Sequence, residues 1–191
     1  LATQGENQFH FIFGSDDICC IVHPSDTAPP LAALNAELEI AGPGGRRRVP
    51  VENFHVLPAD DVRRETWLET GEIVTAVRIP PPPPNFRSAY RKIRARRSWD
   101  FALAGVALAL QFDGDRVVHG RVVLSGAAPV PWRSKPVEDA IRGKTLNRRT
   151  IAAAADAIVD GARPLAKNAY KIPLFRGVIE EELKRFSRPA S

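Results

Sequence analysis

A chain of 191 residues, of which 44% are hydrophobic and 26% charged, has the composition of a globular protein with a buried core. The nearest approach to a membrane span is residues 101–110, about half of the roughly 20 apolar residues that a spanning helix needs, which excludes an integral membrane protein. The net charge of +5 favours an anionic partner: a nucleic acid, a nucleotide or an acidic protein surface.

The first ten residues contain neither the basic nor the apolar region of a secretory signal peptide, so the default prediction is a cytoplasmic location. The chain has no Met and begins with Leu1, and we therefore expect it to be part of a longer polypeptide. The longer polypeptide can therefore contain motifs that this chain lacks.

The first predicted element is a helix at residues 23–35. Ser25 or Asp26 provides an oxygen that caps its N-terminus, and Pro29 and Pro30 fit its first turn. Leucines and alanines further along give it an apolar stripe, so one face of the helix should be buried.

Strands are predicted next. The alternation at residues 37–40, the GPGG turn at 42–45 and the return at 48–51 predict a hairpin, and a further strand covers 72–79. Simple alternation places four residues on one side of that last strand: Ile73, Thr75, Val77 and Ile79.

Five consecutive prolines, residues 80–84, interrupt the chain because each fixes φ and removes a backbone donor. They mark a boundary between two structural units. Beyond them three strands are predicted, ending near Ala95, near Phe112 and at Leu124, and an Asp-Gly turn joins the last two.

Helices are predicted at about residues 135–142, 149–161 and 173–186, and Gly143 and Gly161 are placed to end the first two. Apolar residues recur at helical spacing in the last helix, which buries one of its faces. Strands followed by helices indicate an α+β fold, with three antiparallel strands packed against helices.

Five cationic side chains gather in one short segment: Arg91, Lys92, Arg94, Arg96 and Arg97. In an extended strand, Lys92 shares a face with Tyr90 and Arg94. One interpretation is a surface for an anionic ligand. The other, which periodicity alone favours, is a solvated strand edge where Lys and Arg discourage aggregation.

No motif typical of a metal site, a hydrolase, a kinase or a dinucleotide-binding fold occurs in the chain. The four histidines are scattered. Cys19 and Cys20 are adjacent, which excludes a disulfide framework and fits two small buried side chains. These patterns predict neither catalytic residues nor metal ligands.

The segment His23-Pro24-Ser25-Asp26 is a second candidate site. A helix N-terminus has free N–H groups and a positive dipole, and Ser25 and Asp26 offer oxygens to ribose or ribityl hydroxyls. Lys92 could place its ammonium near the N1 and O2 edge of a reduced flavin and favour the anionic form. The simpler interpretation of the segment is a plain helix cap.

A family resemblance is carried by six segments: ENQFHFIFGSDDICCIVHPSDTAPPLAALNAELEI, VENFHVLP, LETGEIVTAVRIP, YRKIRARRSWDFALAGVALAL, LSGAAPVPWRS and NAYKIPL. Together they resemble the FAD-binding medium subunit of the molybdenum hydroxylases, across essentially the whole chain. This family includes xanthine dehydrogenases, carbon monoxide dehydrogenases and periplasmic aldehyde oxidoreductases of bacteria. Through the segment from Glu6 to Asp26, the chain most resembles the aldehyde oxidoreductases.

The resemblance implies an oxidoreductase subunit that relays electrons. FAD would receive them from iron–sulfur clusters and pass them to an acceptor during oxidation of an aldehyde or an N-heterocycle. The implied partners in a heterotrimer are a molybdopterin-binding large subunit and a small subunit with two-iron two-sulfur clusters, with neither nucleic acid nor membrane among them. If such a complex is exported, the location becomes periplasmic.

The resemblance also assigns residues by their position in the family motifs. Ser25 and Asp26 match the Ser-Asp pair at the sugar and ribityl region of FAD. Ile73 and Val74 match the apolar pair that packs against the flavin, and Lys92 matches the strand lysine near the isoalloxazine ring. These five residues are the predicted cofactor-binding residues.

The implied domains are the C-terminal part of an FAD-binding domain at 1–80, a proline-rich linker at 81–85, and a C-terminal domain of three antiparallel strands and helices at 86–191. The family's glycine-rich loops, which wrap the FAD pyrophosphate, precede the position of Leu1, so we expect this chain alone to bind FAD weakly or not at all. In the aldehyde oxidoreductases a cysteine-rich insertion before the helix can hold a four-iron four-sulfur cluster, and Cys19 aligns with a cysteine near the end of that insertion. It would be a ligand only together with upstream cysteines, because such a cluster needs four thiolates.

Two alternatives without a cofactor stay open. Basic residues alternate with Phe86, Tyr90 and Trp99, as in proteins that bind single-stranded nucleic acid, and such binding weakens steeply with salt. The other alternative is a docking module, whose C-terminal helices and basic face hold partner subunits.

Overall fold

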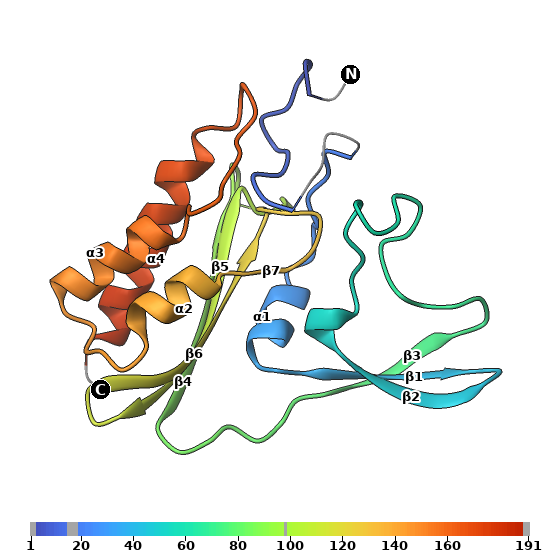
Figure 1. The fold of residues 1–191 in the computed structure, drawn as a ribbon, viewed down its shortest axis with the longest axis horizontal. Helices are drawn as coiled ribbons and strands as arrows, with labels where there is room; N and C mark the ends of the chain where they lie inside the picture. Colours follow the sequence, from blue (N-terminus) through green and yellow to red (C-terminus); the bar gives the residue numbers. More distant parts are fainter. Residues whose placement is uncertain (1–2, 15–18, 98, 189–191) are drawn as a thin grey trace.

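Two antiparallel sheets form the framework of the protein in a computed structural model that describes residues 3–14, 19–97 and 99–188 (Figure 1). The outer ends of the predicted domains 1–80 and 86–191, and part of the stretch from Glu6 to Asp26, lie outside the described residues. Within the described ranges, no helix combines the length and the hydropathy that crossing a bilayer requires.

The smaller sheet has the strand order β2-β1-β3. Its part of the chain consists of α1 (Ala28–Ala33), β1 (Glu37–Gly42), β2 (Gly45–Pro50), the 3-10 helix η1 (Val51–Asn53) and β3 (Ile73–Arg78). The predicted hairpin is confirmed, with Gly45 at φ +106 where β1 turns into β2. The strand predicted at 72–79 is confirmed as β3.

The helix predicted at residues 23–35 is limited to the six residues of α1. Ser25 Oγ accepts hydrogen bonds from the backbone N–H groups of Thr27 (3.2 Å) and Ala28 (3.0 Å), which forms a turn before the helix. Two prolines occupy the first helical turn, as predicted. At the other end, Asn35 adopts a left-handed conformation, φ +56, and the helix stops.

A β-bulge divides the side chains of β3 between its two faces. In the pairing with β1, Val77 lies opposite Leu38 and Ile73 opposite Ala41, and the register skips Thr75. Leu38 and Ala41 lie on opposite faces of β1, so Val77 and Ile73 do so too. The prediction that alternation places the apolar residues of this strand on one side is therefore wrong.

The larger sheet has the strand order β4-β5-β6-β7, and all its pairs are antiparallel. The strands are β4 (Phe86–Ile93), β5 (Ala104–Asp113), β6 (Arg116–Ser125) and β7 (Trp132–Arg133). The three predicted strands are confirmed, as is the Asp-Gly turn, where Gly114 has φ +58. β7 adds a fourth strand, which was not predicted because two residues carry no alternation.

Three helices cover one face of the larger sheet, and α1 lies against the other face (Figure 1). The three helices on the first face are α2 (Lys135–Ile141), α3 (Arg148–Ala157) and α4 (Lys171–Phe186). Gly143, with φ +70, follows the end of α2 as predicted. The predicted α+β class is confirmed.

β5 lies between two apolar clusters and is buried on both faces. Val106, Leu108 and Leu110 belong to the cluster that the three helices cover. Ala107 and Ala109 belong to the cluster formed with α1 and the smaller sheet. Burial on both sides explains why the strand is almost wholly apolar.

A network of ion pairs joins η1 to the larger sheet. Glu52 binds Arg121 of β6 and Arg133 of β7. Arg133 also donates from Nε (2.8 Å) and Nη2 (2.9 Å) to Glu138 of α2, whose side chain is only 2% exposed, and the backbone N–H of Val122 donates to Glu138 Oε1 (3.0 Å). The parts of the chain before and after the proline run are thus bound together, and the domain boundary at 81–85 stays a prediction.

Candidate functional site

The predicted residues Asp26 and Lys92 meet where the chain approaches α1 and leaves β4. Lys92 Nζ donates to Asp26 Oδ2 at 2.5 Å, and Tyr90 Oη donates to Asp26 Oδ1 at 3.3 Å. Tyr90 and Lys92 are alternate residues of β4 and lie on the same face of the sheet. The fold therefore brings together two predicted residues that are 66 positions apart in the chain.

Two serines complete what we call the Asp26–Lys92 cluster, which consists of Ser25, Asp26, Tyr90, Lys92 and Ser125. Ser25 O accepts a hydrogen bond from Ser125 Oγ at 3.4 Å. Gly105 pairs with both Lys92 and Ser125 in the sheet, and a Cβ at Gly105 would lie 3.0 Å from Tyr90 Oη and from Ser125 Cβ. The absence of a side chain at Gly105 gives Tyr90 the space in which it reaches Asp26.

Tyr90 and Ser125 were not among the predicted cofactor-binding residues. The two-residue period of a strand places Tyr90 beside Lys92, so alternation alone would have found it. Ser125 joins the cluster through the register of β5 and β6, for which the sequence contains no local signal.

Burial raises the pKa of Tyr90 to about 12, and the Asp26 carboxylate contributes to the rise. The phenol therefore stays protonated at neutral pH and remains a hydrogen-bond donor. The side chains of Lys92 and Asp26 are 18% and 50% exposed. Because an ion pair this accessible adds about 1 kcal/mol or less to stability, the cluster contributes little to holding the fold together.

The cluster retains hydrogen-bonding capacity for a ligand. Asp26 accepts one of the three N–H groups of the Lys92 ammonium, which leaves two donors. The Asp26 carboxylate has about four acceptor sites and receives two hydrogen bonds from Tyr90 and Lys92. Donors beside a half-exposed carboxylate fit the carbonyl edge and the ribityl hydroxyls of a flavin nucleotide.

Ile73 and Val74 lie on β3, outside the polar cluster. Ile73 is 65% exposed. Val74 is half-buried and packs against the apolar cluster that Tyr90 also contacts. The structure thus offers an apolar side chain at the surface of β3, and the role of this pair toward a flavin stays a prediction.

Cys20 is buried and Cys19 partly exposed. Among the residues that the structure describes, no group of three or more His, Cys, Asp or Glu side chains could hold a metal ion. A role for Cys19 as a cluster ligand stays a prediction.

A histidine pair lies next to Ser25. The ring centroids of His23 and His55 are 4.5 Å apart in an edge-to-face arrangement, and His23 Nε2 and His55 Nδ1 are buried without hydrogen-bond partners in the described part of the chain. Burial lowers the pKa of both rings, that of His55 to about 4, and His23 adds to the decrease at His55. Both rings are neutral at pH 7.

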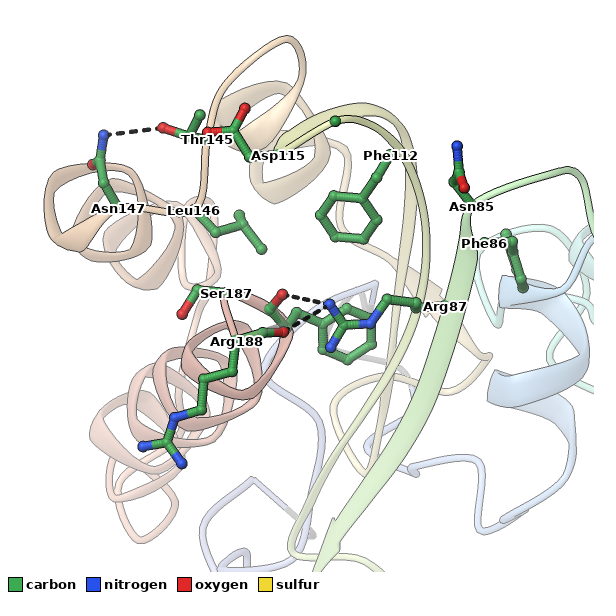
Figure 2. A pocket seen from close by; sticks show the side chains of 12 residues that line it. Asn85, Phe86, Arg87, Phe112, Asp115, Thr145, Leu146, Asn147, Ser187 and Arg188 are labelled. Carbon is green, nitrogen blue, oxygen red and sulfur yellow. Dashed lines mark hydrogen bonds between the residues drawn. The ribbon is translucent and has the colours of Figure 1, made fainter. Parts of the chain in front are cut away.

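A cavity of about 740 Å³ lies at the other end of β4 (Figure 2). Leu146 lines it together with Arg87, which donates to the carbonyl oxygens of Phe186 (2.7 Å) and Arg188 (3.2 Å). The guanidinium also lies over the rings of Phe112 and Phe186. Arg87 therefore caps the C-terminus of α4, and none of the five predicted cofactor-binding residues lines this cavity.

Comparison with known proteins decides the family. Residues 88–185 match the CO dehydrogenase flavoprotein C-terminal domain, and residues 16–82 match the FAD binding domain in molybdopterin dehydrogenase. The chain belongs to the FAD-binding medium subunits of the molybdenum hydroxylases. The resemblance found in the sequence is confirmed.

The curated relatives of this medium-subunit chain are oxidoreductase subunits by name, which confirms the predicted class. The aldehyde oxidoreductase FAD-binding subunit PaoB of Escherichia coli (strain K12) is 33% identical over 183 residues, 95% of this chain and 54% of the relative. The carbon monoxide dehydrogenase medium chain of Hydrogenophaga pseudoflava is 32% identical over 143 residues, 74% of this chain and 48% of the relative. The chain thus spans about half the length of the relatives that it matches.

Solved structures show the same medium-subunit fold. A carbon monoxide dehydrogenase from Hydrogenophaga pseudoflava matches with a TM-score of 0.70 and 28% identity, over 85% of this chain and 54% of that chain. Quinoline 2-oxidoreductase from Pseudomonas putida 86 matches with a TM-score of 0.73 over 97% of this chain and 60% of that chain, and at 21% identity it supports the fold alone.

Proposed function

We propose that this protein is part of an FAD-binding electron-transfer subunit in which the Asp26–Lys92 cluster contacts the flavin nucleotide. The ion pair between Lys92 and Asp26 carries the proposal, because it joins two residues that the family resemblance assigns to one cofactor. The donors and acceptors that this pair leaves over support a ligand with both hydroxyl and carbonyl groups.

When bound, FAD supplies two-electron redox chemistry between iron–sulfur clusters and an acceptor. Lys92 donates to the N1 and O2 edge, where its positive charge favours the anionic reduced form. Asp26 accepts hydrogen bonds from the ribityl chain and holds the Lys92 ammonium in position. Tyr90, which stays protonated, keeps its hydrogen bond to Asp26, and Ser25 adds a hydroxyl beside the sugar.

The apolar pair on β3 has a separate role in this proposal. Ile73 and Val74 pack against the flavin ring, and the 65% exposure of Ile73 in this chain supports that role, because its side chain is available for contact. Burial of one such side chain against a ring contributes about 1.5–3 kcal/mol to binding.

The whole subunit works, in our proposal, with a molybdopterin-binding large subunit and a small subunit that carries two-iron two-sulfur clusters. Relatives named as medium or FAD-binding subunits of carbon monoxide, aldehyde and xanthine oxidoreductases support the shared assembly. The large subunit then sets the substrate, an aldehyde or an N-heterocycle. A four-iron four-sulfur cluster with Cys19 as a ligand belongs to this proposal only if upstream thiolates complete it.

Two substitutions with opposite expected effects test the proposal in the purified complex that contains the whole subunit. Lys92→Met removes a positive charge beside the flavin and should lower its reduction potential. Asp26→Asn leaves that charge without its counter-ion and should raise the potential. We expect shifts of about 30 mV, which correspond to a tenfold change in preference for the reduced form of a two-electron couple.

Spectroelectrochemical titration measures the potential, and absorbance measures flavin occupancy. Lys144→Met is the matched control, because Lys144 is exposed and donates to Ala140 O one turn earlier. The partly exposed Lys92–Asp26 pair adds too little stability for its loss to unfold the subunit. A colourless complex, or a potential that neither variant shifts, contradicts the proposal.

A further inference from the structure

Part of the connection between β4 and β5, residues 94–97 and 99–101, is a cationic surface next to the Asp26–Lys92 cluster, and we call it the arginine loop. Arg94, Arg96 and Arg97 are exposed, and none of them forms an ion pair within the part of the chain that the structure describes. Together with Lys92 they line a hollow of about 300 Å³. Positive charge therefore extends from the cluster to the tip of the loop.

The arginine loop is held in shape by polar contacts of its own. Asp100 accepts hydrogen bonds from the backbone N–H groups of Arg96 (3.1 Å) and Phe101 (3.0 Å), and Arg96 Nη2 donates to Trp99 O at 2.6 Å. Arg94 and Arg97 make no side-chain hydrogen bond to any described residue. Their charges are thus available to another molecule.

Two aromatic rings of the arginine loop project into solvent. Trp99 is 93% exposed and Phe101 is 67% exposed. Trp99 also adopts a left-handed backbone conformation, φ +47, which is unfavourable for a residue other than glycine. An exposed ring on a strained backbone contributes little to the stability of this chain, and it is available for contact with another molecule.

We propose that the arginine loop docks an acidic, electron-accepting protein beside the flavin, an inference that rests on the proposed function. Trp and Arg are the residues most enriched at the energetic centres of protein interfaces. A cationic patch steers an acidic partner and raises its association rate about tenfold to a thousandfold at low salt. One compact loop suits a brief redox encounter better than it suits nucleic acid, which binds along an extended basic groove.

The electrons and the proton of the reaction balance when each acceptor molecule takes one electron. A reduced flavin, FADH⁻, releases one proton to solvent and two electrons as it returns to FAD. The two electrons reduce two ferric haems to the ferrous state, so two acceptor molecules dock in succession for each reduced flavin.

Cytochrome b5, an acidic haem protein, and cytochrome c, a basic one, are the probes for the holoenzyme. Arg94→Glu/Arg97→Glu reverses two charges on the arginine loop. Arg149→Glu/Arg163→Glu changes the net charge equally at two exposed arginines elsewhere. A biosensor measures association with the oxidised holoenzyme, and stopped-flow absorbance measures haem reduction.

We expect the loop variant to slow cytochrome b5 association at least tenfold at low salt while its flavin content stays unchanged, and the control variant to change it less than twofold. Cytochrome c should bind to neither the wild type nor the control. Equal losses in both variants, or no loss in the loop variant, overturn the docking site. Displacement of cytochrome b5 by a single-stranded oligonucleotide that needs the same two arginines also overturns it.

Trp99→Gly separates docking from a structural role. Glycine relieves the left-handed strain, so Tm should stay the same or rise, while loss of the ring should weaken cytochrome b5 binding at least fivefold. A lower Tm with unchanged affinity contradicts the proposal. A purified wild-type complex without flavin contradicts the proposed function, whereas a flavin-containing complex that binds cytochrome b5 independently of the loop contradicts the docking surface alone.

Discussion

Glu138→Gln removes the charge of a buried carboxylate while keeping its shape. Arg133 donates to both oxygens of Glu138, at 2.8 and 2.9 Å, and the backbone N–H of Val122 donates to one of them at 3.0 Å. An amide offers one acceptor oxygen and turns an NH₂ group toward the guanidinium, so a charge-assisted hydrogen bond is replaced by two facing donors.

The size of the effect follows from burial. Removing one partner of a buried ion pair costs about 3–5 kcal/mol. Arg133 is 26% exposed and keeps its contact with Glu52, so we expect the free energy of unfolding to fall by about 2–3 kcal/mol. For a chain of this length, that loss corresponds to a decrease in Tm of about 4–12 °C.

Urea unfolding of the 191-residue chain measures this change, with Asp139→Asn as the matched control. Asp139 is the next residue on α2, its side chain is 66% exposed, and its pair with Arg142 contributes about 0.5 kcal/mol or less. Equal effects of the two substitutions, or a loss below about 1 kcal/mol for Glu138→Gln, would refute the reasoning from burial.

Three further outcomes are expected. Burial lowers the pKa of His55 in the folded state to about 4, so as pH falls the unfolded state takes up a proton at His55 before the folded state does. The free energy of unfolding should therefore decrease as pH falls from about 6.5 to 4. His55→Phe should flatten that part of the pH profile measured by urea unfolding. Gly126→Ala should cost more than about 2 kcal/mol in urea unfolding, because φ is +70 and a Cβ would lie 2.5 Å from Ala102 O, whereas Gly44→Ala, with nothing within 4 Å, should have little effect. Arg87→Ala should increase amide hydrogen exchange at the C-terminal end of α4, which Arg87 caps.

Local chemistry was sufficient to predict most elements of this fold. Gly45 and Gly114 mark the two hairpin turns, and each has a positive φ in the structure. Features that depend on pairing or on a single side-chain contact were not predictable in this way. The bulge at Thr75 arises from the register with β1, and the short α1 arises from a turn that Ser25 Oγ forms before it.

The candidate site was also predictable only in part: some of its residues could be assigned from the sequence, but their contacts could not. The family resemblance assigned Asp26 and Lys92 to one cofactor, and the structure shows that they contact each other. That contact needs β4 and the residues before α1 to lie side by side, which only the completed fold provides. The approach of His23 to His55 likewise joins two segments whose sequences carry no shared pattern.

The burial of β5 on both faces bears on how such subunits evolve by recombination. A crossover at the proline run would exchange residues 88–185 for those of a relative and leave residues 16–82 behind. The alanine face of β5, Ala107 and Ala109, would then meet an α1 and a smaller sheet that had not been selected to fit it. Functional hybrids should therefore inherit the two segments together, or change the alanine face and its neighbours in step.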